Sequence, residues 1–358
     1  MILKRIAYVV NVFPKFSETF IANEIAELRR RGVEVIILSR RLPVEALRHK
    51  VVTDNGLEAL TCYDETRFLP LLRRFRPQLI HAHFATQPTE LARNLANTLG
   101  IPYSLTAHGY DVYRRPPADF AERCRSASAV ITVSEANADY MINQLGASAS
   151  NLSVIPCGVD THWFKPKMAK HSVIPLLVCV ARMRPVKNLP VLLRACGMLR
   201  DQGLKFRCVV LGDGEDRPML EALRESLGLN TIVRFMGLTS QENVRKWWRK
   251  ASIGLLTSLS EGMPVSLMEA LSCAVPVVAP AVGGIPEMVR QGVNGIVVPV
   301  DNATAVSDAI TEILSNSGKA HEMSLAARET ALNQFSISLQ IDRLLSVWNQ
   351  ILYSRHAA

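Results

Sequence analysis

Apolar runs of strand length alternate with longer segments of helical periodicity along most of the chain. Residues 6–13 form a nearly continuous apolar run, which is typical of a parallel strand that is buried on both faces. A helical stripe follows over 18–31, with Ser17 as its expected N-cap and Gly32 as its expected end. This opening segment therefore predicts a strand, a helix and, at 33–38, a second strand.

The same alternation recurs through both halves of the chain. Further strands are predicted at 78–82, 103–106, 129–133, 152–155, 176–180, 205–211, 232–235, 253–256 and 275–279. Helices are predicted at 88–99, 120–126, 135–145, 189–201, 218–227, 241–250 and 264–273, and again after 303. Strands separated by helices indicate doubly wound parallel sheets with right-handed crossovers. We therefore predict an α/β protein with two Rossmann-like domains that face each other across a cleft.

Length and cysteine usage narrow the class further. A chain of 358 residues fits two domains better than one or four, and we place them at 1–166 and 167–339. Seven cysteines without a CxxC pair are typical of a reduced cytoplasmic protein. No apolar stretch approaches the roughly 20 residues that a membrane-spanning helix needs. The sequence thus predicts a cytoplasmic protein that is at most peripheral to a membrane.

The chain carries a net charge of +9, from 41 basic and 32 acidic residues. Such a surplus could serve nucleic acid, an anionic membrane face or phosphorylated small molecules. Nucleic acid is disfavoured because the chain has no basic tail and no basic surface interleaved with aromatic residues. The densest basic clusters of the first domain are Arg29–Arg31 and Arg73–Arg76. We expect them to be either solvated or close to an anionic leaflet.

The segments that follow strands are the informative ones, because open parallel sheets bind ligands beyond the C-terminal ends of their strands. After the strand at 253–256, Pro264 suits a first helical turn, so the loop 258–263 leads into a helix N-terminus. Free N–H groups at such an end form an anion site. Glu261 lies in this loop. Glu269 lies in an apolar helix without an obvious solvent face, which favours a functional carboxylate over a solvated one.

Two basic residues follow the strand at 176–180. Arg182 and Lys187 lie on either side of the strand-end loop. This placement suits a diphosphate, because the planar guanidinium of Arg can donate two hydrogen bonds in a fixed geometry and Lys supplies a point charge. The residues alone leave a solvated basic loop open as the alternative. Gly212 and Gly214 indicate a tight turn after the next strand, but a third glycine is missing and the dinucleotide-binding fingerprint fails.

Histidines mark two strand ends in the first half. His81 and His83 share one face of a strand, so a metal site has to be considered. A metal-dependent hydrolase would need more His and Asp ligands after later strands, and the other histidines have no such placement. We therefore predict no metal site and structural roles for these two residues. His108 follows the next strand, beside Gly109.

The segment around Glu261 resembles a known family. Glu261 and Glu269 stand eight positions apart around Gly262-Met263-Pro264, which resembles the paired-glutamate motif of retaining glycosyltransferases. The resemblance extends through 276–279, 283–287 and 294–295. The class is the group with two facing Rossmann domains, the GT-B fold, that includes glycosyltransferase family 4. Ala274 stands where the pattern usually has a glycine, and we expect the change to affect packing at the helix end.

The resemblance implies a role for each residue of the site. Arg182 and Lys187 would hold the nucleotide diphosphate, and Glu269 would accept hydrogen bonds from the ribose hydroxyls. Glu261 would contact hydroxyls of the donor sugar, and His108 would hold that sugar from the other domain, so these two are the implied catalytic residues. Further residues implied to lie near the nucleotide are Gly212, Gly237, Leu238, Met263, Pro264 and Val265.

Two other segments carry the resemblance. The Ser-Glu-Thr-Phe run at 17–20 resembles the branch of the family that builds bacterial exopolysaccharides of the colanic-acid type. Acceptor or donor contacts would fall on Ser17 and Glu18, although the glycine-rich loop that is common here in the family is missing. Near the end of the chain, about 340–358 looks like the terminal helix that packs back onto the first domain in this fold.

The implied activity is that of a retaining transferase. It would move a sugar from a UDP- or GDP-sugar to a glycan or to a polyprenyl-diphosphate-linked acceptor, in bacterial exopolysaccharide or cell-surface polysaccharide synthesis. No metal and no further cofactor is expected, because basic side chains and a helix N-terminus can neutralise the diphosphate. A nucleotide-sugar epimerase of the same shape and, more remotely, a non-enzymatic nucleic-acid binder stay open as alternatives. Peripheral contact with the inner face of an anionic membrane would bring the enzyme to a lipid-linked acceptor.

Overall fold

The computed structural model describes residues 2–167 and 174–357 and divides the chain into two compact units. The first unit consists of Met1–Gly158 and Ile337–Ala358, and the second of Val159–Ser336. The predicted boundaries, after 166 and after 339, therefore lie eight and three residues further along the chain than the observed ones. Ala358, the last residue of the predicted terminal helix, lies outside the described residues.

The first unit contains a seven-stranded parallel sheet in the order β3-β2-β1-β4-β5-β6-β7. Its strands are β1 (Arg5–Val12), β2 (Glu34–Arg41), β3 (Thr61–Cys62), β4 (Leu79–His83), β5 (Tyr103–Ala107), β6 (Ala129–Thr132) and β7 (Leu152–Val154). Alternate residues of β1 belong to two cores, with Ile6, Tyr8 and Val10 in one and Ala7 and Val9 in the other. Burial on both faces of the sheet explains the unbroken apolar run in the sequence.

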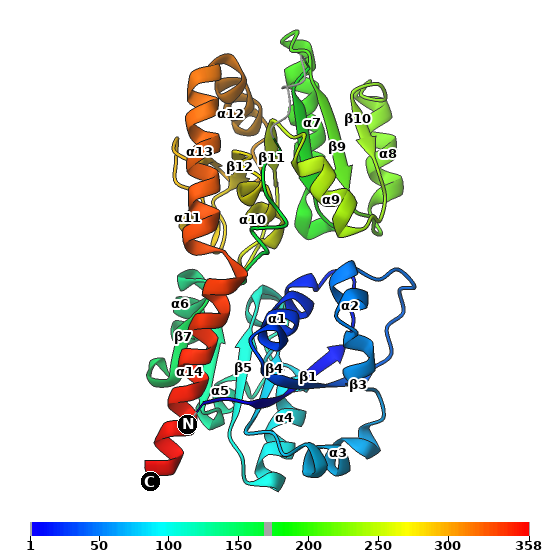
Figure 1. The fold of residues 1–358 in the computed structure, drawn as a ribbon. Helices are drawn as coiled ribbons and strands as arrows, with labels where there is room; N and C mark the ends of the chain where they lie inside the picture. The colour runs from blue at the N-terminus through cyan, green and yellow to red at the C-terminus, as the bar shows by residue number, and fades with distance from the viewer. Residues whose placement is uncertain (1, 168–173, 358) are drawn as a thin grey trace. The chain divides into compact units, whose positions relative to one another are not determined.

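Helices cover both faces of this sheet. They are α1 (Thr19–Arg30), α2 (Lys50–Asp54), α3 (Phe68–Phe75), α4 (Gln87–Leu99), α5 (Phe120–Ser126), α6 (Glu135–Asn143) and α14 (Ile337–Ala357). The last helix of the chain, α14, packs against α1 in the first unit (Figure 1). Its Ile341, Leu344 and Trp348 lie in the same core as Tyr8 of β1.

The second unit contains a six-stranded parallel sheet in the order β10-β9-β8-β11-β12-β13 (Figure 1). Its strands are β8 (Leu176–Val180), β9 (Arg207–Leu211), β10 (Val233–Phe235), β11 (Ile253–Leu255), β12 (Val277–Pro280) and β13 (Gly295–Val298). Its helices are α7 (Leu189–Asp201), α8 (Arg217–Ser226), α9 (Gln241–Trp248), α10 (Val265–Ser272), α11 (Ile285–Met288), α12 (Ala303–Ser315) and α13 (Ser317–Gln334). The predicted pair of doubly wound, Rossmann-like domains is confirmed.

Short elements are the ones that the sequence pattern missed. Nothing was predicted for 39–77, where the structure has α2 with five residues, β3 with two and α3 with eight. The four-residue elements α11 and β13 were missed as well. The elements of two to five residues contain too few positions to establish a period, whereas α3 is as long as α9 and α10, which were predicted.

Two predicted helix starts are wrong in detail. Glu18, not Ser17, occupies the N-cap position of α1, and it makes no side-chain capping hydrogen bond. Its carboxylate forms an ion pair with Lys15 instead. Pro264 is the extended N-cap residue of α10 rather than part of the first turn, since the fixed φ of proline fits either position.

Replacement of Ala274 by glycine is expected to stabilise the second unit by roughly 0.5 to 1 kcal/mol. Ala274 follows the end of α10 in the left-handed region, with φ of 60°, where a Cβ atom is strained. Glycine relieves this strain, but its greater conformational entropy in the unfolded chain offsets part of the stabilisation. Urea denaturation measures the change, and Ala270→Gly, inside α10, is the control that should lose at least about 1 kcal/mol, because its methyl group is also buried. A lower unfolding midpoint for Ala274→Gly would contradict the prediction.

Candidate active site

The strand order of the second unit reverses between β8 and β11, the point at which open parallel sheets bind ligands. The loop after β8 carries Arg182 and Lys187, and the loop after β11 carries Glu261. Since the C-terminal ends of neighbouring parallel strands meet at one edge, Arg182, Lys187 and Glu261 lie on two adjacent loops.

An ion pair joins these two loops. Lys187 Nζ lies 2.5 Å from Oε1 of Glu261, and Ser258 donates its hydroxyl hydrogen to the same oxygen at 2.6 Å. The loops are also joined along the backbone, because the Leu259 N–H donates to the Val186 carbonyl at 2.8 Å. The side chains of Lys187 and Glu261 are 18% and 11% exposed, so the pair can be reached by a ligand.

Glycines allow the surrounding loops to approach closely. Gly212 has φ of 131°, and a Cβ atom on it would lie 2.0 Å from the Ala181 carbonyl oxygen. Its N–H donates to the Gly237 carbonyl at 3.0 Å, which ties the loops after β9 and β10 together. A Cβ atom on Gly283 would lie 1.8 Å from the carbonyl oxygen of Glu261. Larger residues at these two positions would push the backbone of the site apart.

The N-terminus of α10 opens beside Glu261. Pro264 provides no side-chain capping hydrogen bond to the first turn of the helix. The first N–H groups of α10 therefore retain the capacity to bind an anion, and the helix dipole favours negative charge there. The Gly284 N–H donates to the Gly262 carbonyl at 2.7 Å and fixes the loop that leads into this helix.

Glu269 points into the second unit instead of toward solvent. Its oxygens accept hydrogen bonds from Gln241 Nε2 at 3.2 Å and from Trp248 Nε1 at 3.3 Å, both on α9. Only 5% of the residue is exposed. Burial raises the pKa of this carboxyl to about 7, although the two hydrogen bonds act in the opposite direction. The prediction that Glu269 is not a solvated side chain agrees with this placement.

The C-terminal edge of the first sheet carries His108, directly after β5. Asp111 holds this segment, because its carboxyl accepts the N–H of His108 at 2.8 Å and the N–H of Ala85 at 2.6 Å. Burial raises the pKa of Asp111 to about 7. The rings of Phe20 and Phe84 flank the imidazole of His108, with centroid distances of 4.8 and 4.7 Å. The backbone and the ring of His108 are thus both fixed.

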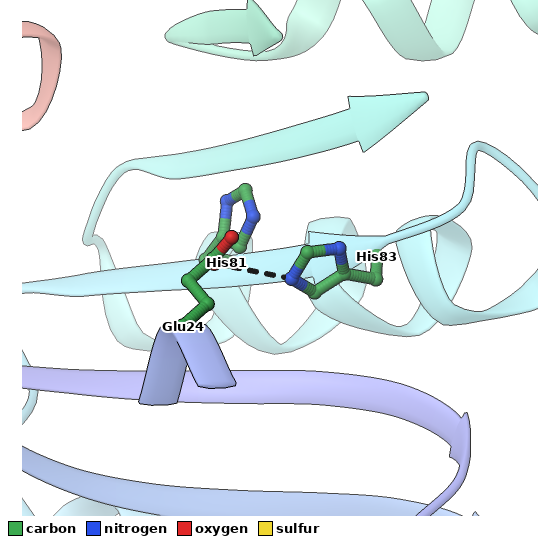
Figure 2. Close-up of side chains that lie close together, drawn as sticks. All are labelled: Glu24, His81 and His83. Atoms are coloured by element: carbon green, nitrogen blue, oxygen red, sulfur yellow. Dashed lines mark hydrogen bonds and ion pairs between the residues drawn. The ribbon is translucent and has the colours of Figure 1, made fainter. Parts of the chain in front are cut away.

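Glu24, His81 and His83 form a buried cluster in the same unit (Figure 2). Glu24 points from α1 toward β4, where its Oε1 lies 3.2 Å from Nε2 of His83. The ligand atoms of the three residues lie within 4.8 Å of one another, a spacing that a metal ion could use. However, His81 already has a hydroxyl partner on each ring nitrogen, Ser104 at 2.8 Å and Thr106 at 3.1 Å. Hydrogen bonds therefore satisfy His81 without a metal.

The structure brings some of the predicted site residues together and separates others. Lys187 contacts Glu261, and Gly212 contacts Gly237, whereas the side chain of Glu269 is directed to α9. Arg182, Leu238 and Ser17 are exposed, Val265 and Glu18 are half-buried, and Met263 and Pro264 are buried.

Two functional candidates were missed from the sequence. Asp111 stands three residues after His108 in the strand-end segment, and this proximity was a usable signal. Glu24 lies on the apolar stripe of α1 beside Ile21 and Ile25 and is 1% exposed. A carboxylate on the buried face of a helix was the signal that could have found it.

Both halves of the chain match known family models. The model described as glycosyl transferases group 1 matches residues 164–330, and the model described as glycosyltransferase family 4 matches residues 17–163. A D-inositol 3-phosphate glycosyltransferase of Actinosynnema mirum is 30% identical over 346 residues, which covers 82% of each chain. A putative colanic acid biosynthesis glycosyltransferase, WcaL of Escherichia coli K12, is 26% identical over 86% of this chain and 89% of its own.

The fold agrees with that of a solved structure. The structure of Anabaena HepE in complex with UDP-glucose superposes with a TM-score of 0.79 at 18% identity, over 99% of this chain and all of the other. Sequence matches in both halves and the two Rossmann-like units thus lead to one conclusion: the chain belongs to the glycosyltransferases of family 4 and has the GT-B fold.

Proposed function

We propose that the protein is a retaining glycosyltransferase that moves a sugar from a nucleotide-diphosphate sugar to a glycan acceptor in bacterial exopolysaccharide or cell-surface polysaccharide synthesis. The observation that carries the proposal is the Lys187–Glu261 pair on adjacent loops at the strand-order reversal. Similarity to a colanic-acid enzyme supports the pathway class, and the UDP-glucose complex of HepE supports a UDP-sugar ahead of a GDP-sugar as donor.

The leaving diphosphate determines what this edge of the sheet has to do. Cleavage of the sugar–phosphate bond places negative charge on the diphosphate, and fixed positive groups stabilise that charge. Lys187, Arg182 and the N-terminus of α10 are the groups that we assign to it. Without a bound nucleotide-sugar, the carboxylate of Glu261 neutralises the ammonium group of Lys187. A diphosphate therefore has to share Lys187 with Glu261 or to displace Glu261 from it.

The remaining contacts concern the sugar and the ribose. We assign hydroxyls of the donor sugar to Glu261, whose second carboxylate oxygen is not the one that contacts Lys187 and Ser258. A further hydroxyl of the same sugar is assigned to His108. The ribose hydroxyls are assigned to Glu269. A ribose hydroxyl would replace one of the two side chains, Gln241 or Trp248, that now donate a hydrogen bond to this carboxylate. Acceptor or donor contacts remain assigned to Ser17 and Glu18.

Calorimetry with UDP, GDP and ADP is the first test, and we expect UDP to bind most tightly. The matching nucleotide-sugar, offered with a glycan acceptor, should then give a product with the anomeric configuration of the donor, as read by NMR. We propose that no metal takes part, so transfer should survive EDTA. Inversion at the anomeric carbon would contradict the retaining mechanism, and epimerised free donor without glycan would identify a nucleotide-sugar epimerase.

We also propose that the acceptor is carried on a polyprenyl diphosphate at the inner face of a membrane. None of the described helices is long and apolar enough to cross a bilayer. Arg31 of the first predicted basic cluster instead pairs with Glu27 and Asp342. Arg73 and Arg74 at the end of α3 are exposed, as is the following Arg76. They precede β4 and so lie at the N-terminal ends of the strands, whereas His108 follows the C-terminal end of β5.

The second cluster is therefore expected to contribute most to binding of anionic vesicles. Each basic residue near an anionic surface contributes about 1 kcal/mol, so Arg73, Arg74 and Arg76 changed together to Ser should weaken vesicle binding at least tenfold. Half-molar salt should release the unaltered protein from the vesicles, because it screens electrostatic attraction beyond a few ångströms. The control removes the same charge from the second unit, at the exposed Lys205, Arg207 and Arg234. Equal sedimentation with neutral and anionic vesicles would indicate a soluble acceptor.

A further inference from the structure

The buried polar cluster of the first unit forms a continuous hydrogen-bonded chain that ends at His108. His83 Nδ1 lies 3.1 Å from Nε2 of His108, and His83 Nε2 lies 3.2 Å from Oε1 of Glu24. Gln340 of α14 donates from Nε2 to Oε2 of Glu24 at 2.7 Å. His83 is fully buried and Glu24 nearly so, so these contacts are made away from solvent.

The direction of the first hydrogen bonds follows from chemistry. The N–H of Gly158 donates to Oε1 of Gln340 at 2.7 Å, which identifies the amide oxygen of that side chain and leaves its NH₂ group to face Glu24. Tyr8 donates its hydroxyl hydrogen to Oε1 of Glu24 at 2.6 Å. A carboxylate among such donors accepts from each of them, and the nearby nitrogen of His83 completes the set.

The direction of the remaining bonds follows in turn. Because Glu24 accepts, Nε2 of His83 carries a proton. We take the His83 ring as neutral, so its Nδ1 has a lone pair. That lone pair accepts from Nε2–H of His108. Burial and the neighbouring His83 lower the pKa of His108 well below its ordinary value, so the ring is neutral and has one proton only. Nδ1 of His108 is then the bare nitrogen, and no hydrogen bond within residues 2–167 and 174–357 occupies it.

We propose that Glu24 and His83 are positioning residues that hold His108 as the Nε2–H tautomer and present its bare Nδ1 as an acceptor to a hydroxyl of the donor sugar. The sugar contact rests on the proposed function, whereas the tautomer does not. Asp111 and the flanking phenylalanine rings fix where the imidazole lies, and the chain through His83 fixes which nitrogen accepts. His81 is bonded to hydroxyls on both sides and is not part of the chain.

The Glu24→Gln variant is expected to reverse the direction of the hydrogen bonds that run from residue 24 through His83 to His108. Gln340 still donates, because Gly158 fixes its orientation, so the oxygen of the new amide has to face Gln340. The NH₂ group then faces His83 and Tyr8, donates to Nε2 of His83, and meets a Tyr8 hydroxyl that has turned to accept. His83 becomes protonated on Nδ1 and donates to Nε2 of His108, and the single proton of His108 moves to Nδ1. The substitution thus converts the proposed acceptor nitrogen into a donor with almost no change in side-chain volume.

Imidazole ¹⁵N NMR tests the tautomers without any requirement for activity. In the unaltered protein we expect a protonated Nε2 and a bare Nδ1 on both His83 and His108, and in Glu24→Gln the opposite pattern on both rings. Thr106→Val is the matched control, since it removes a buried hydroxyl from His81 and leaves the chain intact. A bare Nε2 on His108 of the unaltered protein, or unchanged tautomers in Glu24→Gln, would overturn the proposal.

Kinetics test the consequence for the reaction. Glu24→Gln should lower kcat at least tenfold and leave UDP affinity unchanged, because UDP is assigned to the second unit, while Thr106→Val should retain kcat. Equal losses in both variants would indicate a structural role and overturn the proposal. Absence of sugar transfer by the unaltered protein would contradict the proposed function instead, and the NMR result would still decide the tautomers.

Discussion

The Glu261→Gln variant is expected to transfer sugar about a hundredfold more slowly than the unaltered enzyme. A charged hydrogen bond contributes roughly 1.5–3 kcal/mol, and loss of that amount from the transition state corresponds to one to two decades in rate. Glutamine keeps the shape of the side chain and can still accept from Ser258 and Lys187. The melting temperature should therefore change little, and steady-state kinetics at saturating donor measure the effect.

Nucleotide affinity separates the two partners of the ion pair. Glu261→Gln removes the negative charge that competes with the diphosphate for Lys187, so UDP should bind at least as tightly as before. Lys187→Ala removes a cation assigned to the diphosphate, and UDP should bind at least tenfold more weakly. If calorimetry finds weaker UDP binding in Glu261→Gln and no change in Lys187→Ala, the assignment of these residues is wrong.

The sequence was most informative where the fold repeats a simple period. Buried parallel strands such as β1 and β8 are apolar throughout, because both faces of the sheet are covered, and amphipathic helices such as α7 show their stripe. The strand-order reversal then places Lys187 and Glu261 together, although 74 positions separate them along the chain. For these strand-end residues the family resemblance implied one common site, and the observed strand order explains why they meet.

Side-chain partners across the core could not be predicted in this way. Glu24 owes its surroundings to β4, which lies 59 positions further along the chain, and to α14, which lies 316 positions further along. The sequence pattern states that position 24 is buried, but not which donors meet the carboxylate there. For Glu269 the apolar helix predicted burial correctly, whereas its donors on α9 depend on how two helices pack.

Glu269→Gln is expected to remove a pH-dependent loss of stability from the second unit. The carboxyl has a pKa of about 7 in the folded chain, against an ordinary 4.5, because its charged form is buried. Between these values the folded state retains a proton that the unfolded state has lost, so the free energy of unfolding falls as the pH rises through this window. The full loss is about 3 kcal/mol for a fully buried group. Below pH 4.5 both states hold the proton, and the effect vanishes.

Glutamine imitates the protonated form, since its amide can accept from Trp248 and donate to Gln241 once that amide turns. The advantage of the variant over the unaltered protein should therefore be about 3 kcal/mol larger at pH 8 than at pH 4.5. Urea unfolding can be followed by tryptophan fluorescence, because Trp163, Trp247 and Trp248 all lie in the second unit. The exposed Glu225, changed to Gln, should leave the pH dependence of unfolding as it is. If the free energy of unfolding depends on pH in Glu269→Gln as it does in the unaltered protein, this buried carboxyl keeps its charge in the folded state.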